Sequence, residues 1–411
     1  MSESTTTCSS QPLDWLPYHR AIIDHLKEVD RYVWDWFSNS VVDPKSAEDV
    51  RFDLLKSTYR IDRESQTSLY DTAADVAGRL GIEARISIYQ AQNPMGLNAS
   101  LAYVPGEIHI VLHGPIAEKL TAVEIEALFG HEMGHYLLRH RNSSEAQIAA
   151  EMLHALCNDF SSHPAHFASA RLLQLYDEIF CDRASYVVTG DLKAVVSMLV
   201  KVHTGVQDVN AESYLRQAEE ILARGPAATK EITHPEAFIR ARSIQLWSQT
   251  DPRVNEIVCE MIEGKPGLDE LDLVAQRRVA VGTRRLMDAL LCHRWFQTDL
   301  VLAHARLYFD DYAPPPAAFR DVELLTHVRT EPDSLRDYWC YLLLDFAAAD
   351  RDLDEAPLAK GLELADQLGF KDRLSELARN ELKLRKSQIE QIDQQREKFL
   401  GAADRSMAVE S

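Results

Sequence analysis

The sequence predicts a mainly α protein with a small antiparallel β-sheet, and therefore an α+β fold. Three observations support this class. Apolar residues recur with a helical period along most of the chain, and the clearest β-rich runs lie between residues 84 and 114. At 411 residues the chain is also too long for one small core, so we expect two or three domains.

The N-terminal segment 13–39 has the pattern of one or two amphipathic helices. An aromatic stripe on such a helix can seek a membrane interface, but the acidic neighbours here favour packing in a core. The stripe is formed by Trp15, Trp34 and Trp36.

A helix, a strand and a hairpin are expected next. Residues 68–82 have a helical period, and Gly81 lies where a glycine C-cap belongs. A strand over 84–90 follows. Residues 98–114 form two β-rich runs separated by a Pro-Gly pair, which is typical of a hairpin. This sheet precedes the segment that carries the chemistry.

The stretch "TAVEIEALFGHEMGHYLLRH" (121–140) predicts the central helix. Thr121 and Glu124 match the capping box S/T-x-x-E, so the helix should begin there and run to about His140. With 3.6 residues per turn, His131 and His135 lie on the same face.

The pattern H-E-x-x-H in this helix predicts a hydrolytic zinc centre. Such a centre needs three protein ligands and an open position for water, and His131 and His135 supply two ligands. Glu132 is the expected general base, which takes a proton from the zinc-bound water and passes it to the leaving amine. A five-residue match arises by chance too easily to stand alone, so a third ligand is required.

The third ligand is expected on a later helix. Leu138 and Arg141 exclude the pattern H-E-x-x-H-x-x-G-x-x-H, whereas Glu178 on the helix predicted over 168–189 completes a His-His-Glu set. Asp182 lies one turn after Glu178, on the same face, where it can accept a hydrogen bond from a ligating histidine. The alternative for Asp182 is a salt bridge to Arg183 or another surface cation.

These residues resemble the M48 metallopeptidases over roughly residues 60–246. The segments that carry the resemblance are, in order, "NASLAY", "ALFGHEMGHYLL", "EIFCD" and "THPEAFIR". The resemblance implies a zincin-like metallopeptidase fold, one Zn²⁺ per chain on His131, His135 and Glu178, and Glu132 as the base. Many members of that family are embedded in membranes, but this chain lacks their hydrophobic segments.

The resemblance also implies roles for a later histidine and arginine. His234 and Arg240 should lie near the centre, where they hydrogen-bond the tetrahedral oxyanion and hold neighbouring carboxylates. The alternative for His234 is a helix-start residue before Pro235. In zinc peptidases of this architecture the peptide or protein substrate binds along a sheet edge, here expected at residues 98–104 or 107–113.

The C-terminal part should be an all-α domain. Residues 341–370 resemble the tellurite-resistance TerB-like domain, and this resemblance covers about 320–385. The alternating Asp350, Asp352 and Asp354 are similar to a calcium loop, but the EF-hand glycine and final glutamate are missing. An acidic helix start is favoured, in which Asp354 caps the helix and Glu355 complements its dipole.

The expected organisation has five parts, with a proline cluster near 312–321 as the candidate linker. They are an N-terminal helical region (1–59), an M48-like zinc metallopeptidase domain (60–250), a helical connecting region (251–319), a TerB-like helical domain (320–385), and a charged helix with a flexible tail (386–411).

Composition limits the partners and the compartment. The net charge of −20 and the pI near 5.2 argue against nucleic acid as a partner. The N-terminus has no signal-peptide pattern, and no apolar run is long enough to cross a bilayer. The six scattered cysteines suit free thiols, so we expect a cytoplasmic protein.

Two functions fit these features. The leading hypothesis is a zinc-dependent endopeptidase whose C-terminal helical domain regulates access or recruits substrates. The alternative is a zinc-containing binding or chaperone-like protein of a stress response, in which proteolysis is latent or absent. The intact Glu132 favours the enzyme.

Overall fold

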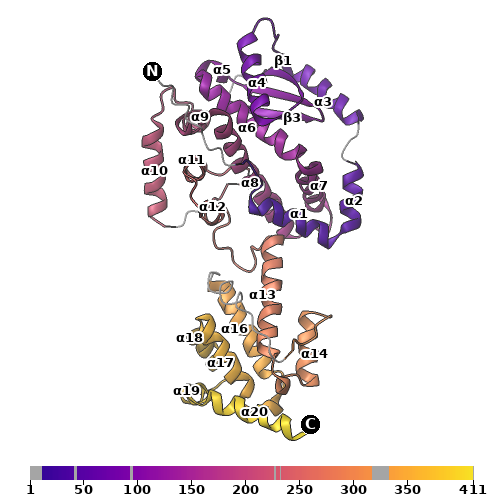
Figure 1. Ribbon diagram of the computed structural model, residues 1–411, viewed down its shortest axis with the longest axis vertical. Coiled ribbons are helices and arrows are strands. Elements are labelled where there is room, and N and C mark those ends of the chain that lie inside the picture. The colour runs from indigo at the N-terminus through magenta and orange to yellow at the C-terminus, as the bar shows by residue number, and fades with distance from the viewer. Residues whose placement is uncertain are drawn as a thin grey trace, which may run out of the picture. The chain divides into compact units, whose positions relative to one another are not determined.

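The computed structural model describes residues 12–40, 44–92, 96–225, 228–231, 233–316 and 333–410. It contains two compact units (Figure 1). The first unit comprises Met1–Gly264 with Asp272–Val274, and the second comprises Lys265–Leu271 with Ala275–Ser411. The candidate linker and the start of the TerB-like region lie partly outside the described residues, from 317 to 332.

The first unit holds a four-stranded sheet and most of the helices. The strands are β1 (Thr58–Arg60), β2 (Arg85–Ala91), β3 (Asn98–Val104) and β4 (Glu107–His113). The helices are α1 (Pro17–Val29), α2 (Arg31–Ser40), α3 (Pro44–Ser57), α4 (Thr67–Leu80), α5 (Ile116–Lys119), α6 (Ala122–His140), α7 (Glu145–Asn158), α8 (Pro164–Thr189), α9 (Leu192–Thr204), α10 (Ala211–Ala223), α11 (Ala237–Ser248) and α12 (Val254–Ile262).

The sheet has the order β1-β2-β4-β3 and is mixed rather than wholly antiparallel. The expected hairpin is present: β3 and β4 pair antiparallel, and Gly106 in the turn has φ of 77°. However, β4 also pairs with β2, and this pair is parallel. The parallel pair arises because β3 returns along the outside of β4, so β4 runs in the direction of β2. The α+β class is confirmed.

The strand order decides which edge of the sheet is free. Because β4 pairs with both β2 and β3, residues 107–113 form an interior strand and cannot pair with a further strand. Among the described residues β3 pairs with β4 alone, so its outer edge at residues 98–104 is exposed to a further strand. Helix α6 packs against β3, which places this edge beside the helix of the H-E-x-x-H motif.

The two faces of the sheet have different neighbours. Ile108, Ile110 and Leu112 are buried in the main core together with residues of α4 and α6. The opposite face carries Glu107, whose buried carboxylate accepts hydrogen bonds from Arg51 of α3 at 2.9 and 3.2 Å. These bonds overcome the effect of burial and lower the pKa of Glu107 to about 2.

The start of α6 is fixed by the predicted capping box. The Thr121 hydroxyl accepts a hydrogen bond from the Glu124 amide, and the Glu124 carboxylate accepts one from the Thr121 amide at 2.8 Å. The same buried carboxylate accepts hydrogen bonds from Ser197 and Lys201 of α9. One side chain therefore caps α6 and ties it to α9.

Helices α6 and α8 approach each other closely at two glycines. A Cβ atom built on Gly130 would lie 2.9 Å from the Cα of Ser185, and one built on Gly134 would lie 3.0 Å from the Cα of Cys181. A hydrogen atom at these positions lets the two backbones approach each other. This approach brings the motif helix to the helix that carries Glu178.

Helix α1 also packs against α8. Tyr18 stacks on Tyr176 with ring centroids 4.8 Å apart, and its hydroxyl donates to Asp272 at 2.6 Å. The fully buried His19 hydrogen-bonds Asp177 at 3.0 Å. Of the tryptophan stripe, Trp34 is buried, Trp15 is half-buried and Trp36 is 57% exposed. Core packing is thus the outcome for Trp34 but not for Trp36.

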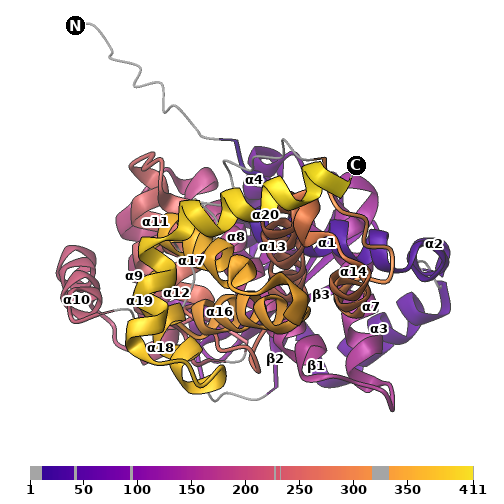
Figure 2. The same ribbon diagram turned by 90° about the horizontal axis from the view of Figure 1, so that it is seen from below.

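The second unit is all α over its described residues. Its helices are α13 (Leu273–Leu291, within this unit from Ala275), α14 (Asp299–Tyr308), α16 (Asp333–Ala348), α17 (Ala356–Leu368), α18 (Lys371–Glu381), α19 (Lys386–Gln394) and α20 (Arg396–Glu410). Helix α17 lies among α16, α18, α19 and α20 (Figure 2). The core includes Phe346, Leu362 and Leu374, all fully buried.

The acidic turn before α17 is built differently from the expected helix start. The Asp350 carboxylate accepts hydrogen bonds from the Thr298 hydroxyl and the Asp352 amide. The N-cap is Glu355, without a side-chain cap, whereas Asp354 lies outside the helix with φ of 49°. Asp354 therefore does not cap α17.

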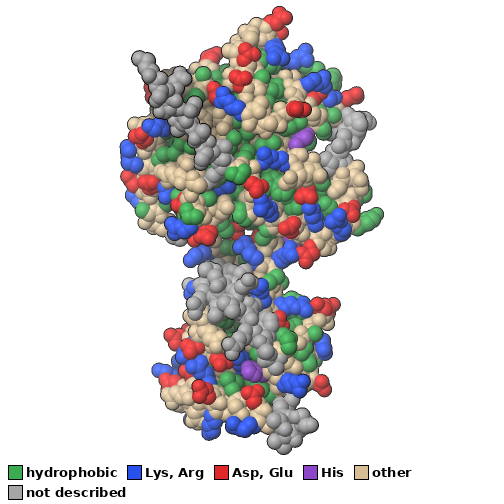
Figure 3. All heavy atoms as spheres, viewed as in Figure 1, with side chains coloured by type: hydrophobic (Ala, Val, Ile, Leu, Met, Phe, Trp, Pro, Cys, Tyr) green, Lys and Arg blue, Asp and Glu red, His purple; other side chains and the backbone are tan. Residues whose placement is uncertain are grey.

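The surface carries charge of both signs. Acidic and basic side chains are interspersed over the face seen in Figure 3. None of the described helices combines the length and the apolar character that a bilayer crossing requires. The five cysteines of the described residues are free thiols, and Cys8 lies outside those residues.

Replacing Gly130 by Ala should lower the free energy of unfolding by about 1–3 kcal/mol, because the added methyl overpacks the α6–α8 contact. The matched control is Gly78→Ala on the exposed side of α4, where a Cβ meets nothing within 4 Å. That change should stabilise the protein by about 1 kcal/mol. Urea unfolding of both variants tests this; equal stabilities would contradict the close contact.

Candidate metal centre

Three side chains converge between α6 and α8. Nε2 of His131 lies 3.4 Å from Oε2 of Glu178, and Nε2 of His135 lies 3.4 Å from Oε1 of the same carboxylate. One ligand atom of each residue falls within 4.8 Å of the others. Among the described residues this is the one group of three or more such side chains that could hold a metal ion.

The donor set fits a zinc ion. Two imidazole nitrogens and one carboxylate are the ligands of a hydrolytic zinc site that keeps a position open. Oε2 of Glu178 is buried and accepts no hydrogen bond, but Nη1 of Arg240 lies 3.1 Å from it, so one cation already faces this oxygen. Both histidines turn Nε2 toward this carboxylate. With Nε2 unprotonated, the two imidazole lone pairs and a carboxylate oxygen could bind one cation.

Asp182 orients the first histidine. Its Oδ1 lies 3.2 Å from Nδ1 of His131, and the residue is 1% exposed. With the proton on Nδ1, His131 donates to Asp182 and keeps Nε2 free as a ligand. The alternative of a surface ion pair is wrong, because Asp182 is buried.

Arg240 of α11 stabilises both carboxylates of α8. It donates to Asp182 from Nε at 2.8 Å and from Nη2 at 2.6 Å, and its Nη1 lies 3.1 Å from Oε2 of Glu178. Burial opposes ionisation of the two carboxyls, but the guanidinium outweighs burial and lowers the pKa of both Glu178 and Asp182. Both acids are therefore held as anions.

The metal-free centre has a protonated histidine. Burial alone would lower the pKa of His131, but the nearby carboxylates of Glu178 and Asp182 outweigh it and raise the pKa to about 10. At neutral pH a metal ion must therefore displace a proton from this ring.

Glu132 is buried beside His131 with 5% of its surface exposed. Burial raises its pKa, against the opposing effect of the two motif histidines. A carboxylate with a raised pKa is a stronger base, so it accepts a proton more readily in a reaction near neutral pH.

His234 reaches the centre from the segment before α11. Its Nε2 lies 3.5 Å from Oε1 of Glu178, while 54% of the side chain remains exposed. Its Nδ1 lies 2.8 Å from the Thr233 hydroxyl. Helix α11 begins at Ala237 with Glu236 as N-cap, so His234 does not start that helix. All the candidate residues named from the sequence thus lie in one region.

The sequence reasoning missed Gly130 and Gly134, on which the position of α8 depends. The signal was present, since two small residues spaced by four on a helix mark a face that another backbone can approach closely. However, Gly134 occupies one of the two x positions of the H-E-x-x-H pattern, and the pattern does not specify which residue stands there.

Replacing Arg240 by Met should lower the free energy of unfolding of the metal-free protein by about 3–5 kcal/mol at pH 7, because two buried carboxylates lose their cation. The lowered pKa values contribute stability above the unfolded value near pH 4, and this contribution is lost as the pH falls through the folded-state values. The deficit should therefore shrink below pH 4.

Urea unfolding with chelator present, at pH 7 and below pH 4, measures this deficit. The control is Arg242→Met, which removes a surface ion pair with Glu219 and should change the free energy of unfolding by less than about 1 kcal/mol. A deficit that is independent of pH would contradict the assignment of Arg240.

Part of the chain is similar to known proteins. Residues 64–248 match the model of peptidase family M48. Over 209 residues the chain is 28% identical to the "Plastoglobule-localized metallopeptidase 48, chloroplastic" of Arabidopsis thaliana, which corresponds to 46% of this chain and 59% of the relative. The chain thus spans less than two thirds of that relative's length. No solved structure matches. The region that contains α6, α8 and α11 is therefore similar to peptidase family M48.

Proposed function

We propose that the protein is a zinc-dependent endopeptidase with its centre at His131, His135 and Glu178. The observation that carries the proposal is the convergence of two imidazole nitrogens on one buried carboxylate, with a ligand atom of each residue within 4.8 Å of the others. The match to family M48 and the relative named a metallopeptidase support the same reaction class.

In this proposal the chain's own side chains divide the chemistry. Zinc, when bound, lowers the pKa of a bound water and polarises the scissile carbonyl. Glu132 takes the proton of the attacking water and delivers it to the amine that leaves. The half-exposed His234 is positioned to donate to the oxyanion of the tetrahedral intermediate.

Arg240 has a supporting role in the reaction. It is 3% exposed and lies behind Glu178 and Asp182, so it holds these carboxylates as anions and does not reach a substrate. Asp182 in turn fixes the orientation of His131.

The proposed substrate is a peptide or unfolded protein segment bound as an added strand on the outer edge of β3. That edge is free among the described residues and lies beside α6. Pairing through main-chain groups gives affinity with weak sequence selectivity.

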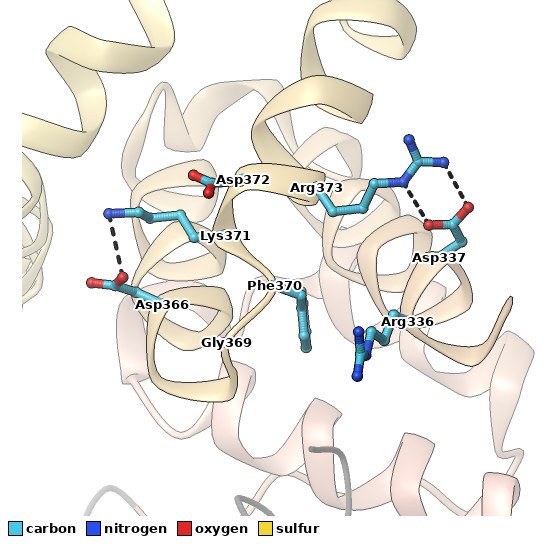
Figure 4. Close-up of a pocket in the computed structure, with 8 residues that line it drawn as sticks. All are labelled: Arg336, Asp337, Asp366, Gly369, Phe370, Lys371, Asp372 and Arg373. Carbon is cyan, nitrogen blue, oxygen red and sulfur yellow. Dashed lines mark hydrogen bonds and ion pairs between the residues drawn. The ribbon is translucent and has the colours of Figure 1, made fainter. Parts of the chain in front are cut away.

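For the second unit we propose a regulatory or recruiting role, with the TerB-like resemblance as the basis. A cavity of about 560 Å³ at the start of α18 supports a binding function. Figure 4 shows ion pairs on both sides of it, Lys371 with Asp366 and Arg373 with Asp337. This cavity also favours the alternative, a stress-response binding protein with latent proteolysis. Cytoplasmic localisation likewise stays a prediction.

Purified protein should contain about one zinc ion per chain, and His135→Ala and Glu178→Ala should each lose it, because a site with two protein ligands binds zinc weakly. The matched control is His113→Ala, which changes an exposed contact to Ser100 on the sheet. Elemental analysis of the four proteins gives the answer. A folded wild-type protein that stays without zinc after reconstitution would contradict the centre.

Changing Glu132 to Gln should lower kcat for cleavage of labelled casein by about 10²–10⁴-fold while zinc stays bound, because the amide cannot accept the proton. The control on the same helix is Glu126→Gln, which affects only an ion pair with Arg79 outside the centre. Unaltered cleavage by Glu132→Gln would refute the proposed base and favour the binding-protein alternative.

A further inference from the structure

His234 is the one candidate residue of the centre that no helix holds. It lies between α10 and α11, in a segment of which the structure describes residues 228–231 and 233–236. Its ring must stay within reach of Glu178 for a role in the reaction, although half of it is exposed. Some contact other than helix packing therefore has to fix the segment.

Arg171 of α8 makes this contact. Its Nε donates to the carbonyl of Glu231 at 2.8 Å, and its Nη2 donates to the carbonyl of Thr229 at 2.8 Å. Arg171 precedes Glu178 by seven residues, two helical turns, so the two side chains share a face of α8. The helix that supplies Glu178 thereby also holds the segment that supplies His234.

Further contacts tie the same segment to its surroundings. The buried Thr229 donates its amide to the Met261 carbonyl of α12 at 2.9 Å, and its hydroxyl accepts from the Glu231 amide at 3.2 Å. The N-cap residue Glu236 accepts from the Lys230 amide at 3.4 Å. Residues 229–231 are thus held by several hydrogen bonds, and Arg171 is the side chain that connects them to α8.

We propose that Arg171 is a positioning residue that sets His234 against the metal centre. This proposal rests on the proposed peptidase function. The planar guanidinium can donate to two carbonyls at once, which the single ammonium of lysine cannot do with the same geometry. Arg171 acts on the reaction through His234, because its hydrogen bonds from Nε and Nη2 go to the backbone of the segment.

The test uses the full chain with Arg171→Met and Arg171→Lys, and with Arg242→Met as control. Arg242 is an arginine of α11 whose guanidinium donates to Glu219 and Gln245 rather than to the segment. Hydrogen–deuterium exchange should rise in peptides covering 228–236 for both Arg171 variants and stay unchanged in α6. Zinc content should stay at the wild-type level, because the three proposed ligands lie on α6 and α8. Unchanged exchange at 228–236 would overturn the proposal.

Kinetics separate positioning from a general loss of stability. Arg171→Met should lower kcat by about 10- to 100-fold with little change in KM, as expected for a displaced group that acts in the transition state. In a His234→Ala background the same change should have no further effect. An equal loss of kcat in both backgrounds, or full activity of Arg171→Lys, would overturn the proposal.

The two proposals can fail separately. A wild-type protein that binds zinc but cleaves no substrate would contradict the proposed peptidase function. The exchange experiment would still decide whether Arg171 holds residues 228–236, since it requires no substrate.

Discussion

The candidate centre depends on the close approach of α6 and α8. Glu178 and the two motif histidines come from different helices, and their ligand atoms fall within 4.8 Å because Gly130 and Gly134 let the backbones nearly touch. Larger side chains there would set the helices at the usual 8–10 Å between axes with side chains between them. The motif residues are the candidates for the chemistry, and two glycines four positions apart on α6 let them come close to Glu178.

Charge inside this contact is balanced only in part. Asp182 and Glu178 are buried anions, and Arg240 is the buried cation that faces both. The metal-free chain completes the balance with a proton on His131, whose pKa is raised to about 10. In the proposed centre a metal ion would take the place of this proton as the second positive charge, so metal affinity would fall with decreasing pH.

Local signals predicted much of the fold. The Thr121–Glu124 capping box, the Gly81 C-cap and the hairpin turn at Gly106 are all present, because each depends on residues a few positions apart. The parallel pairing of β4 with β2 could not be read in this way, since it depends on strand order. The same holds for the centre: spacing gave His131 and His135, whereas the contact of Arg171 with residues 229–231 spans some sixty positions and left no local pattern.

Helix α1 lies outside the region similar to family M48, which starts at residue 64, yet it covers α8 directly beside Glu178. Tyr18 and His19 are buried against Tyr176 and Asp177. A fragment cut at the family boundary would expose this apolar side of α8 to water and leave Asp177 without its histidine. A fragment that preserves the candidate centre must consequently begin before the region similar to family M48, because α1 packs against the helix that carries Glu178.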